Sequence, residues 1–156
     1  MTDNNKPKLM IHRYPEKNEI TLDDGNRYVT YPCSASVMEP CCRMLEEVFN
    51  APYAHFDPAD LSAPTDMTRP ILYRETVAES KETLPDDAER LYASAEELKE
   101  AECVMILMEL SPDVDLDTVE EVSRRLGDYA NEMAAIIWAS NFTRDVSYRI
   151  SLIGIF

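Results

Sequence analysis

Hydrophobic and polar residues alternate along the first part of the chain in the way that β-strands require. Residues 8–14 predict a first strand. Residues 19–31 predict a hairpin with Asp24 and Gly25 at its turn, because Asp-Gly between strand-forming residues is typical of tight hairpins. We therefore expect residues 1–35 to form an N-terminal β-hairpin extension.

The spacing of apolar residues then changes from two to three and four, which indicates a helix over residues 36–50. Ser36 and Glu39 have the spacing of a capping box at the start of this helix. Four prolines follow within residues 51–70, and proline withholds the backbone donor that a helix or a sheet needs. This stretch is therefore predicted to be a loop.

Strand and helix patterns alternate in the second half of the chain. Residues 71–77 predict a strand, Thr83 and Pro85 open a helix, and residues 94–100 predict a short second helix. Residues 103–110 are apolar at nearly every position, which is typical of a strand in the middle of a sheet with both faces covered.

Three further elements complete the pattern. Asp115 or Asp117 begins a helix with a single apolar stripe. The residues of this stripe are Val119, Val122, Leu126, Tyr129 and Met133. Residues 134–139 predict a buried strand, so the only tryptophan, Trp138, is expected in the core. Alternation over residues 146–152 predicts a last strand with one face more exposed than the other.

These elements predict an α+β protein in which a mixed β-sheet is covered by helices. We expect a single domain over residues 1–156, since a chain of this length with 45% apolar residues can bury a core. In this prediction the hairpin extension (1–35) and a helix with its Pro-rich loop (36–70) precede an α+β core (71–156).

The order and spacing of the last elements resemble the C-terminal domain of FtsZ, the bacterial homologue of tubulin, over roughly residues 85–156. The matching stretches are Ala101–Val104, Pro112–Val122, Ala135–Ile137 and Arg149–Ile153. Asp57–Leu61 is more weakly similar to the synergy loop of that family, which completes the GTPase site of the neighbouring subunit. The resemblance implies a fold like that of the FtsZ/tubulin C-terminal domain.

The GTP-binding domain of that family has no counterpart in this sequence. A glycine-rich phosphate loop needs close approach of the backbone, whereas the chain has only 3 glycines and no two of them lie within six residues. We therefore expect no GTPase activity by this chain alone, and no cofactor.

The net charge of −15 narrows the classes of binding partner that we expect. Such a charge repels the phosphates of nucleic acids and of anionic lipids, so neither a nucleic acid nor a membrane is an expected partner. The N-terminal residues lack the apolar segment of a secretory signal, and no apolar run approaches the ~18–20 residues that span a membrane. We expect a soluble cytoplasmic protein with acidic, solvated helix faces.

The four cysteines are interpreted as reduced, buried thiols, because no secretory signal precedes them. They are Cys33, Cys41, Cys42 and Cys103. A metal site built from the first three with His12 is the alternative interpretation. It lacks the Cys-x-x-Cys spacing of zinc sites, and we predict no metal site.

No nucleophile motif surrounds any Ser or Cys, so we predict no catalytic residues and no enzymatic activity. The Pro-rich loop is the predicted interaction site, since it is longer than a connection requires and long loops often bind partners. Its candidate residues are Tyr53, His55, Phe56, Asp57 and Asp60.

Our leading hypothesis is a non-enzymatic interaction or regulatory module that docks to itself or to a partner protein, with a role in cell division or filament assembly. The alternative is a small-molecule-binding protein or small enzyme with a site between subunits. Arg144 and Arg149 would then bind an anionic ligand, unless they pair with the abundant acids. A third hypothesis is a phage or mobile-element protein that uses its acidic surface to occupy a basic target.

Overall fold

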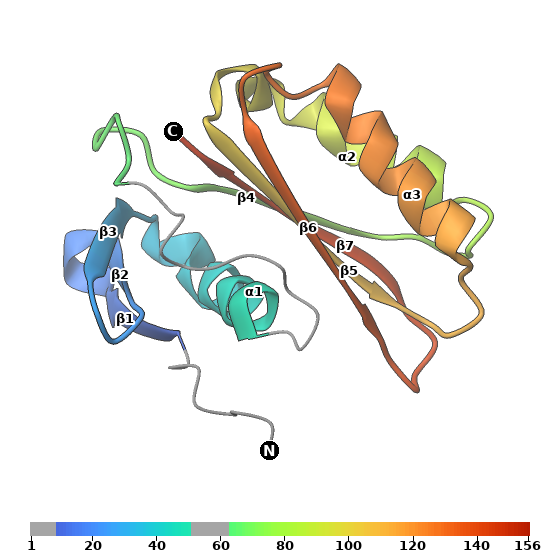
Figure 1. The fold of residues 1–156 in the computed structure, drawn as a ribbon, viewed down its shortest axis with the longest axis horizontal. Coiled ribbons are helices and arrows are strands. Elements are labelled where there is room, and N and C mark those ends of the chain that lie inside the picture. The colour runs from blue at the N-terminus through green and yellow to red at the C-terminus, as the bar shows by residue number, and fades with distance from the viewer. Residues whose placement is uncertain (1–8, 51–62) are drawn as a thin grey trace. The chain divides into compact units, whose positions relative to one another are not determined.

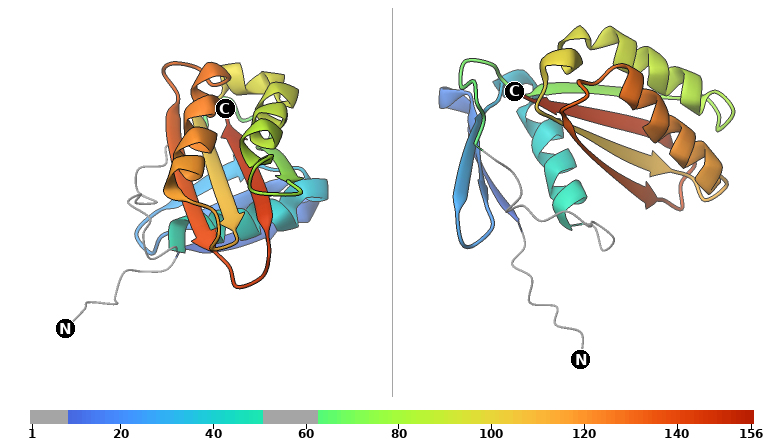
Figure 2. Two further views of the ribbon diagram at one scale, coloured as in Figure 1. Left: turned by 90° about the vertical axis from the view of Figure 1, so that its right-hand side faces the viewer. Right: turned by 45° about the horizontal axis from the view of Figure 1, so that its top comes forward.

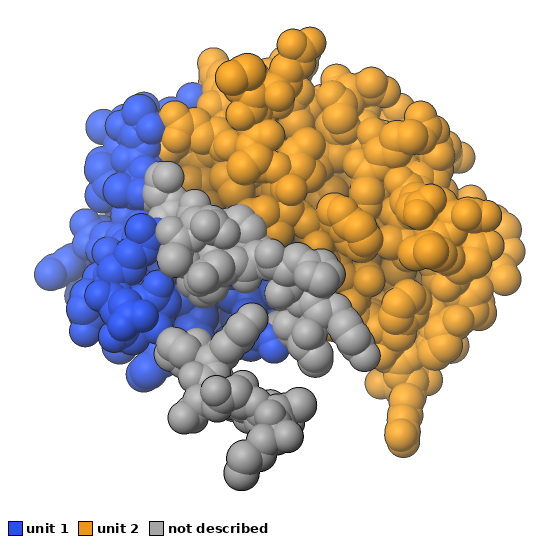
Figure 3. Space-filling view, in the orientation of Figure 1, with its two compact units in different colours: residues 1–71 blue, residues 72–156 orange. Residues whose placement is uncertain are grey.

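The computed structural model describes residues 9–50 and 63–156, which belong to two compact units. The first unit is Met1–Ile71 and the second is Leu72–Phe156 (Figure 3). Each unit contains a β-sheet of its own (Figure 1). The single domain over the whole chain stays a prediction.

The first unit contains an antiparallel sheet in the order β1-β2-β3. The strands are β1 (Met10–Tyr14), β2 (Glu19–Asp23) and β3 (Tyr28–Pro32). The predicted hairpin turn is confirmed: Gly25 adopts a φ of 90°, which favours glycine, and its N–H donates to Oδ1 of Asp23 over 2.8 Å. The first predicted strand pairs with the hairpin as a third strand.

Helix α1 (Met38–Asn50) follows a short 3-10 turn, Ala35–Val37. The α-helix thus begins later than the predicted capping box requires, because Ser36 lies inside the 3-10 turn and its hydroxyl pairs with that of Ser34 over 3.0 Å. Arg13 of β1 joins the sheet to this helix through Glu39, over 3.0 Å.

The second unit contains a four-stranded mixed sheet in the order β4-β7-β5-β6. Its elements along the chain are β4 (Leu72–Val77), α2 (Leu84–Ser94), β5 (Cys103–Leu110), α3 (Leu116–Arg125), β6 (Ala135–Phe142) and β7 (Tyr148–Ile155). Strand β5 is parallel to β6 and antiparallel to β7, and β4 is antiparallel to β7. The expected mixed sheet, with the 103–110 strand in its interior, is confirmed.

Helices α2 and α3 lie on one face of this sheet (Figure 2, right). The core beneath them is formed by apolar residues of both helices together with residues of β4, β5 and β7. The strand residues are Leu72, Val104, Ile106, Met108, Leu110, Ile150 and Leu152. Within the described part of the chain, no helix is long and apolar enough to cross a membrane.

The two helices begin differently from each other. Asp115 caps α3 as predicted, accepting a hydrogen bond of 2.8 Å from the backbone N–H of Thr118. The side chain of Thr83 does not cap α2. Its hydroxyl donates to the carbonyl oxygen of Ser80 instead, over 3.2 Å.

The burial expected for the last two strands is wrong for both. Strand β7 lies between β4 and β5, and it is buried on both faces from Ile150 to Ile155, including Ser151. Strand β6 is an edge strand instead, and Trp138 is 48% exposed. Met133 does not lie on the apolar stripe predicted for the helix that begins at Asp115. It is 89% exposed, because α3 ends at Arg125.

Candidate interaction surface

An apolar patch is exposed along β6, which forms one edge of the four-stranded sheet. The patch consists of Ile136, Trp138 and Phe142, which we call the β6 surface. Their exposed fractions are 42%, 48% and 56%. Since side chains alternate along a strand, these three even-numbered residues lie on the same face of β6. Large apolar side chains gathered at an exposed edge are typical of a protein-binding surface.

The pairing of β6 with β5 determines which face the patch occupies. Val104 of β5 is the partner of Ile136, and Ile106 is the partner of Trp138. Both β5 residues belong to the core under the helices, so the β6 surface lies on the helix-bearing face of the sheet. That core cluster contains residues of β4, β5 and β7 but no residue of β6. The patch is therefore exposed because the helices do not bury β6.

The segment between α3 and β6 positions the start of the strand. Oδ1 of Asn131 accepts a hydrogen bond of 2.9 Å from the N–H of Met133, and the carbonyl oxygen of Asn131 accepts from the N–H of Ala134 over 3.0 Å. The N–H of Ala135 then donates to the carbonyl oxygen of Glu102 over 2.9 Å, which starts the pairing with β5. This chain of contacts fixes the register of β6.

Charged side chains join the helices that lie beside the patch. Arg125 of α3 reaches Asp86 and Glu89 of α2 over 2.8 Å and 3.2 Å, and its Nε donates to Glu121 over 2.8 Å. Hydrogen bonds from Arg124 and from Arg125 lower the pKa of Glu121 to about 2. Glu121 is thus held as a carboxylate by two arginines, and the cluster is a structural contact between helices.

The two arginines predicted to bind an anion lie on different elements. Arg144 is exposed in the turn after β6 and is followed by Asp145. Arg149 is half-buried on β7, where its partner on β5 is Glu109. A carboxylate beside each arginine competes with an anionic ligand. Anion binding by these residues stays a prediction.

The predicted loop site lies outside the described residues. It comprises Tyr53, His55, Phe56, Asp57 and Asp60. Its role in binding also stays a prediction. The described residues that follow contain a turn in which Asp66 accepts hydrogen bonds from the backbone N–H of Thr68 over 2.9 Å and from its hydroxyl.

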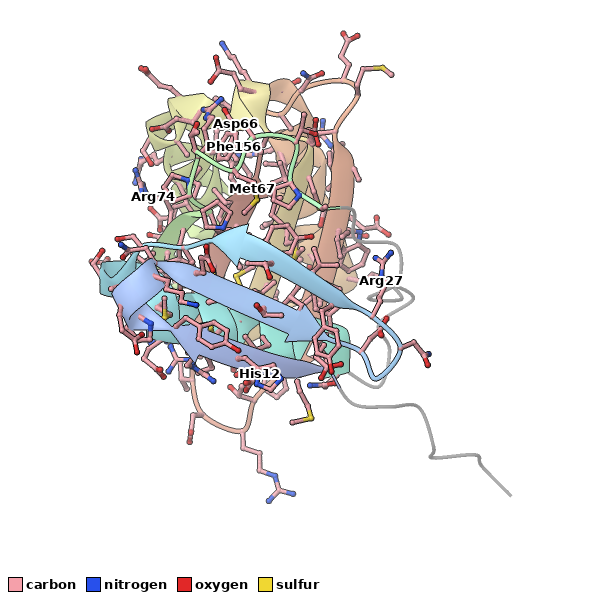
Figure 4. The ribbon with its side chains drawn as sticks, turned by 90° about the vertical axis from the view of Figure 1, so that its left-hand side faces the viewer. His12, Arg27, Asp66, Met67, Arg74 and Phe156 are labelled. Carbon is pink, nitrogen blue, oxygen red and sulfur yellow. The ribbon has the colours of Figure 1, made fainter. Side chains whose placement is uncertain are left out.

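The alternative metal site is not assembled by the residues that the structure describes. His12 lies on β1 (Figure 4), and its Nε2 is 3.6 Å from Oδ2 of Asp23. The cysteines are buried free thiols, and burial raises the pKa of Cys42 and of Cys103 to about 11. Residues 9–50 and 63–156 contain no group of three His, Cys, Asp or Glu side chains arranged to hold a metal ion.

The sequence did not predict the β6 surface. Ile136 and Trp138 fall within the predicted buried strand 134–139, because an apolar strand normally lies in the interior of a sheet, and Phe142 lies beyond the predicted end of that strand. One signal was present: no charged residue occurs from Met133 to Thr143, in a chain with a net charge of −15. That signal is shared by buried strands, so only the strand order distinguishes the two cases.

The chain has an FtsZ/tubulin-like fold, in agreement with the expectation from the C-terminal sequence. The solved structures that it resembles include two of FtsZ from M. jannaschii. For a mutant form the TM-score is 0.63 at 16% identity, and for an empty dimer it is 0.58 at 18% identity. TubZ from Bacillus thuringiensis serovar israelensis, in a protofilament of its GTPγS form, gives a TM-score of 0.54 at 12% identity.

These matches cover most of this chain but well under half of each solved structure. Each covers 78% of this chain, which is more than residues 85–156 supply, so the structural likeness extends beyond the sequence resemblance. The chain spans only 39%, 37% and 34% of the respective structures. No protein-family model matches the sequence, and no curated protein matches it. At these identities the likeness establishes the fold alone.

Proposed function

We propose that this chain is a non-enzymatic protein-interaction module that acts in the assembly of filaments of the FtsZ/tubulin type. The observation that carries the proposal is the exposed, uncharged β6 surface on a fold of this type. Solved structures with a similar fold include an FtsZ dimer and a TubZ protofilament. A chain with this fold and an exposed apolar edge is suited to bind a subunit of such an assembly.

The absence of enzymatic activity is part of the proposal. The three glycines occur at positions 25, 127 and 154, so no segment supplies the closely spaced glycines of a phosphate loop. The net charge of −15 also opposes the binding of nucleotide phosphates. The proposed setting is the cytoplasm, with protein partners and without nucleic acid or membrane.

Co-sedimentation with FtsZ from the same organism tests this function. FtsZ is polymerised with GTP in the presence of the purified protein, and polymer mass is followed by light scattering and by pelleting. We expect the protein to enter the pellet and to change the amount of polymer. The matched control is the same mixture with GDP, in which FtsZ polymers and the pelleted protein should both be lost. A protein that stays in the supernatant and leaves polymer mass unchanged contradicts the proposal.

A phosphate-release assay tests the non-enzymatic part separately. The protein alone should release no more phosphate from GTP than buffer does. Steady turnover that increases in proportion to protein concentration, and that survives a second purification step, would show that the chain is an enzyme.

A further inference from the structure

No strand among residues 9–50 and 63–156 pairs with the outer edge of β6. On its inner side, the N–H groups of Ala135 and Thr143 donate to the carbonyl oxygens of Glu102 and Leu110, over 2.9 Å and 2.8 Å. In a regular strand the N–H and C=O of one residue point to the same side, and the side alternates from residue to residue. The odd-numbered residues therefore face β5, and the even-numbered ones present their backbone groups outward.

The outward backbone groups and the exposed side chains belong to the same residues. Ile136, Trp138 and Phe142 have both outward backbone groups and exposed side chains. Ser140 is the fourth even-numbered residue of β6. Natural edge strands are usually protected by charged residues, proline or bulges. From Met133 to Thr143 the sequence contains neither a charged residue nor proline. Neither charge nor proline therefore protects this edge from pairing with another strand.

We propose that the edge of β6 pairs in antiparallel fashion with β6 of a second copy of this chain, which joins the two four-stranded sheets into one. The inference rests on the proposed function, since it identifies the partner at the β6 surface. A two-fold axis perpendicular to the sheet makes the pairing antiparallel and lets each copy contribute the same surface.

The charges at the two ends of the strand favour the antiparallel orientation over the parallel one. Glu132 precedes the uncharged stretch, and Arg144 and Asp145 follow it. In an antiparallel pair, the start of one strand lies beside the end of the other, so Glu132 is brought near one base and one acid of the partner. In-register parallel pairing would instead place Glu132 beside the partner's Glu132 and Arg144 beside the partner's Arg144.

The outward backbone N–H and C=O groups also determine which residues of the two β6 strands pair. Even-numbered residues must face even-numbered residues for their backbone groups to bond. A two-fold axis at Ala139 pairs Ile136 with the partner's Phe142 and Trp138 with the partner's Ser140. This register uses all four outward residues of each strand and forms about eight backbone hydrogen bonds. It also buries the β6 surface at the centre of the contact.

The expected salt dependence separates this contact from binding to a basic partner. Two chains of net charge −15 repel each other, and added salt screens this repulsion. Self-association through an uncharged strand should therefore become tighter as salt increases. Binding of a basic protein would become weaker under the same conditions.

Sedimentation velocity of the full chain, from micromolar to submillimolar concentration, tests the proposal. We expect the mass to rise from the 17.8 kDa of one chain toward twice that value. Trp138 is the only tryptophan, so its fluorescence reports on the contact directly. Its emission should shift to shorter wavelength, and quenching by acrylamide should decrease, over the same concentration range.

A matched pair of variants at one position tests the backbone pairing. Ser140→Pro removes an outward N–H, and an edge strand tolerates proline where that N–H faces solvent. It should weaken the dimer at least about tenfold. Ser140→Val keeps the N–H and should leave the dimer intact. Phe142→Lys, at an exposed side chain, should also weaken it at least about tenfold, which covers the case in which the proline variant does not fold.

The proposal is overturned if the chain stays monomeric at every concentration, or if the dimer survives both Ser140→Pro and Phe142→Lys in folded protein. Both contacts use the β6 surface and therefore compete, but their failures differ. A monomer that co-sediments with FtsZ overturns the strand pairing alone, and a dimer that stays in the supernatant overturns the proposed function alone.

Discussion

The hydroxyl of Tyr92 in α2 donates a hydrogen bond of 2.9 Å to the carbonyl oxygen of Val122 in α3. Tyr92 is 1% exposed, and its burial raises the pKa of the phenol above its usual value. The ring of Tyr129 lies 6.2 Å from that of Tyr92, and its hydroxyl donates to Glu89 over 3.1 Å. Tyr92 therefore links the two helices through a buried contact, and Tyr129 links α2 to the segment after α3 near solvent.

Tyr92→Phe should destabilise the protein by about 1–2 kcal/mol, since it removes a buried donor and leaves its acceptor without that partner. Tyr129→Phe is the matched control, and its effect should be smaller because water can replace its contact with Glu89. Urea unfolding followed by circular dichroism measures both free energies of unfolding. Equal losses in the two variants would contradict the assignment of Tyr92 as the buried link.

Glu121 provides a test that depends on pH. Its pKa is lowered from 4.5 to about 2 by hydrogen bonds from Arg124 and Arg125, so the folded state binds this proton less readily than the unfolded state does. The resulting stabilisation is present above about pH 4.5 and is lost as the pH falls through about 2. The melting temperature of wild type should therefore exceed that of Glu121→Gln at pH 7, and this difference should shrink below pH 4.5.

Glu120→Gln is the control for this pH series. Glu120 is exposed, and no ion pair is found for it within residues 9–50 and 63–156. Its substitution should change the melting temperature little, and by the same amount at each pH. The explanation is wrong if the difference between wild type and Glu121→Gln is the same at pH 7 and pH 3.

The sequence predicted β5 correctly because the information needed is contained in the strand itself. Apolar residues occupy both faces from Cys103 to Met108, and such a strand is stable only when both faces are covered. The α3 cap was predictable for the same reason, since Asp115 acts on a backbone group three residues away. The fold class followed from these local patterns together with the resemblance to FtsZ.

The burial of β6 and β7 could not be predicted in this way, because it depends on strand order. The last strand enters the sheet between β4 and β5, so Ser151 is 3% exposed although the alternation of β7 indicated an exposed face. Strand β6 is left at the edge, where Ile136 and Trp138 are exposed although the sequence around them is that of an interior strand. Strand order is set by contacts between distant parts of the chain, and the candidate surface depends on it.

The four thiols should be protected in the native protein. All are buried, and at neutral pH the raised pKa of Cys42 and of Cys103, about 11 for each, keeps these two as unreactive thiols. A chromogenic disulfide reagent at pH 7 should react slowly with the native protein and rapidly with all four thiols in urea. Rapid reaction of the native thiols would show that the cysteines are accessible.

The same sample tests the alternative metal site. Zn²⁺ that binds only the folded protein would raise its melting temperature, by the linkage between binding and folding. We expect no change on addition of Zn²⁺, measured against Mg²⁺ as the control ion. A stabilisation specific to Zn²⁺ and abolished by Cys41→Ser would instead favour a site that includes this cysteine.

Ile106 and Ile136 test the central and edge positions of β5 and β6. Both lie on the helix-bearing face of the sheet, but Ile106 is 0% exposed and Ile136 is 42% exposed. Ile106→Ala should cost about 2–5 kcal/mol because it leaves a cavity in the core. Ile136→Ala should cost under about 1 kcal/mol, since a half-exposed side chain loses little burial. Urea unfolding at micromolar concentration, where self-association is weakest, measures both values. Similar losses at the two positions would mean that β6 is covered, and the exposed surface on which the proposed binding depends would not exist.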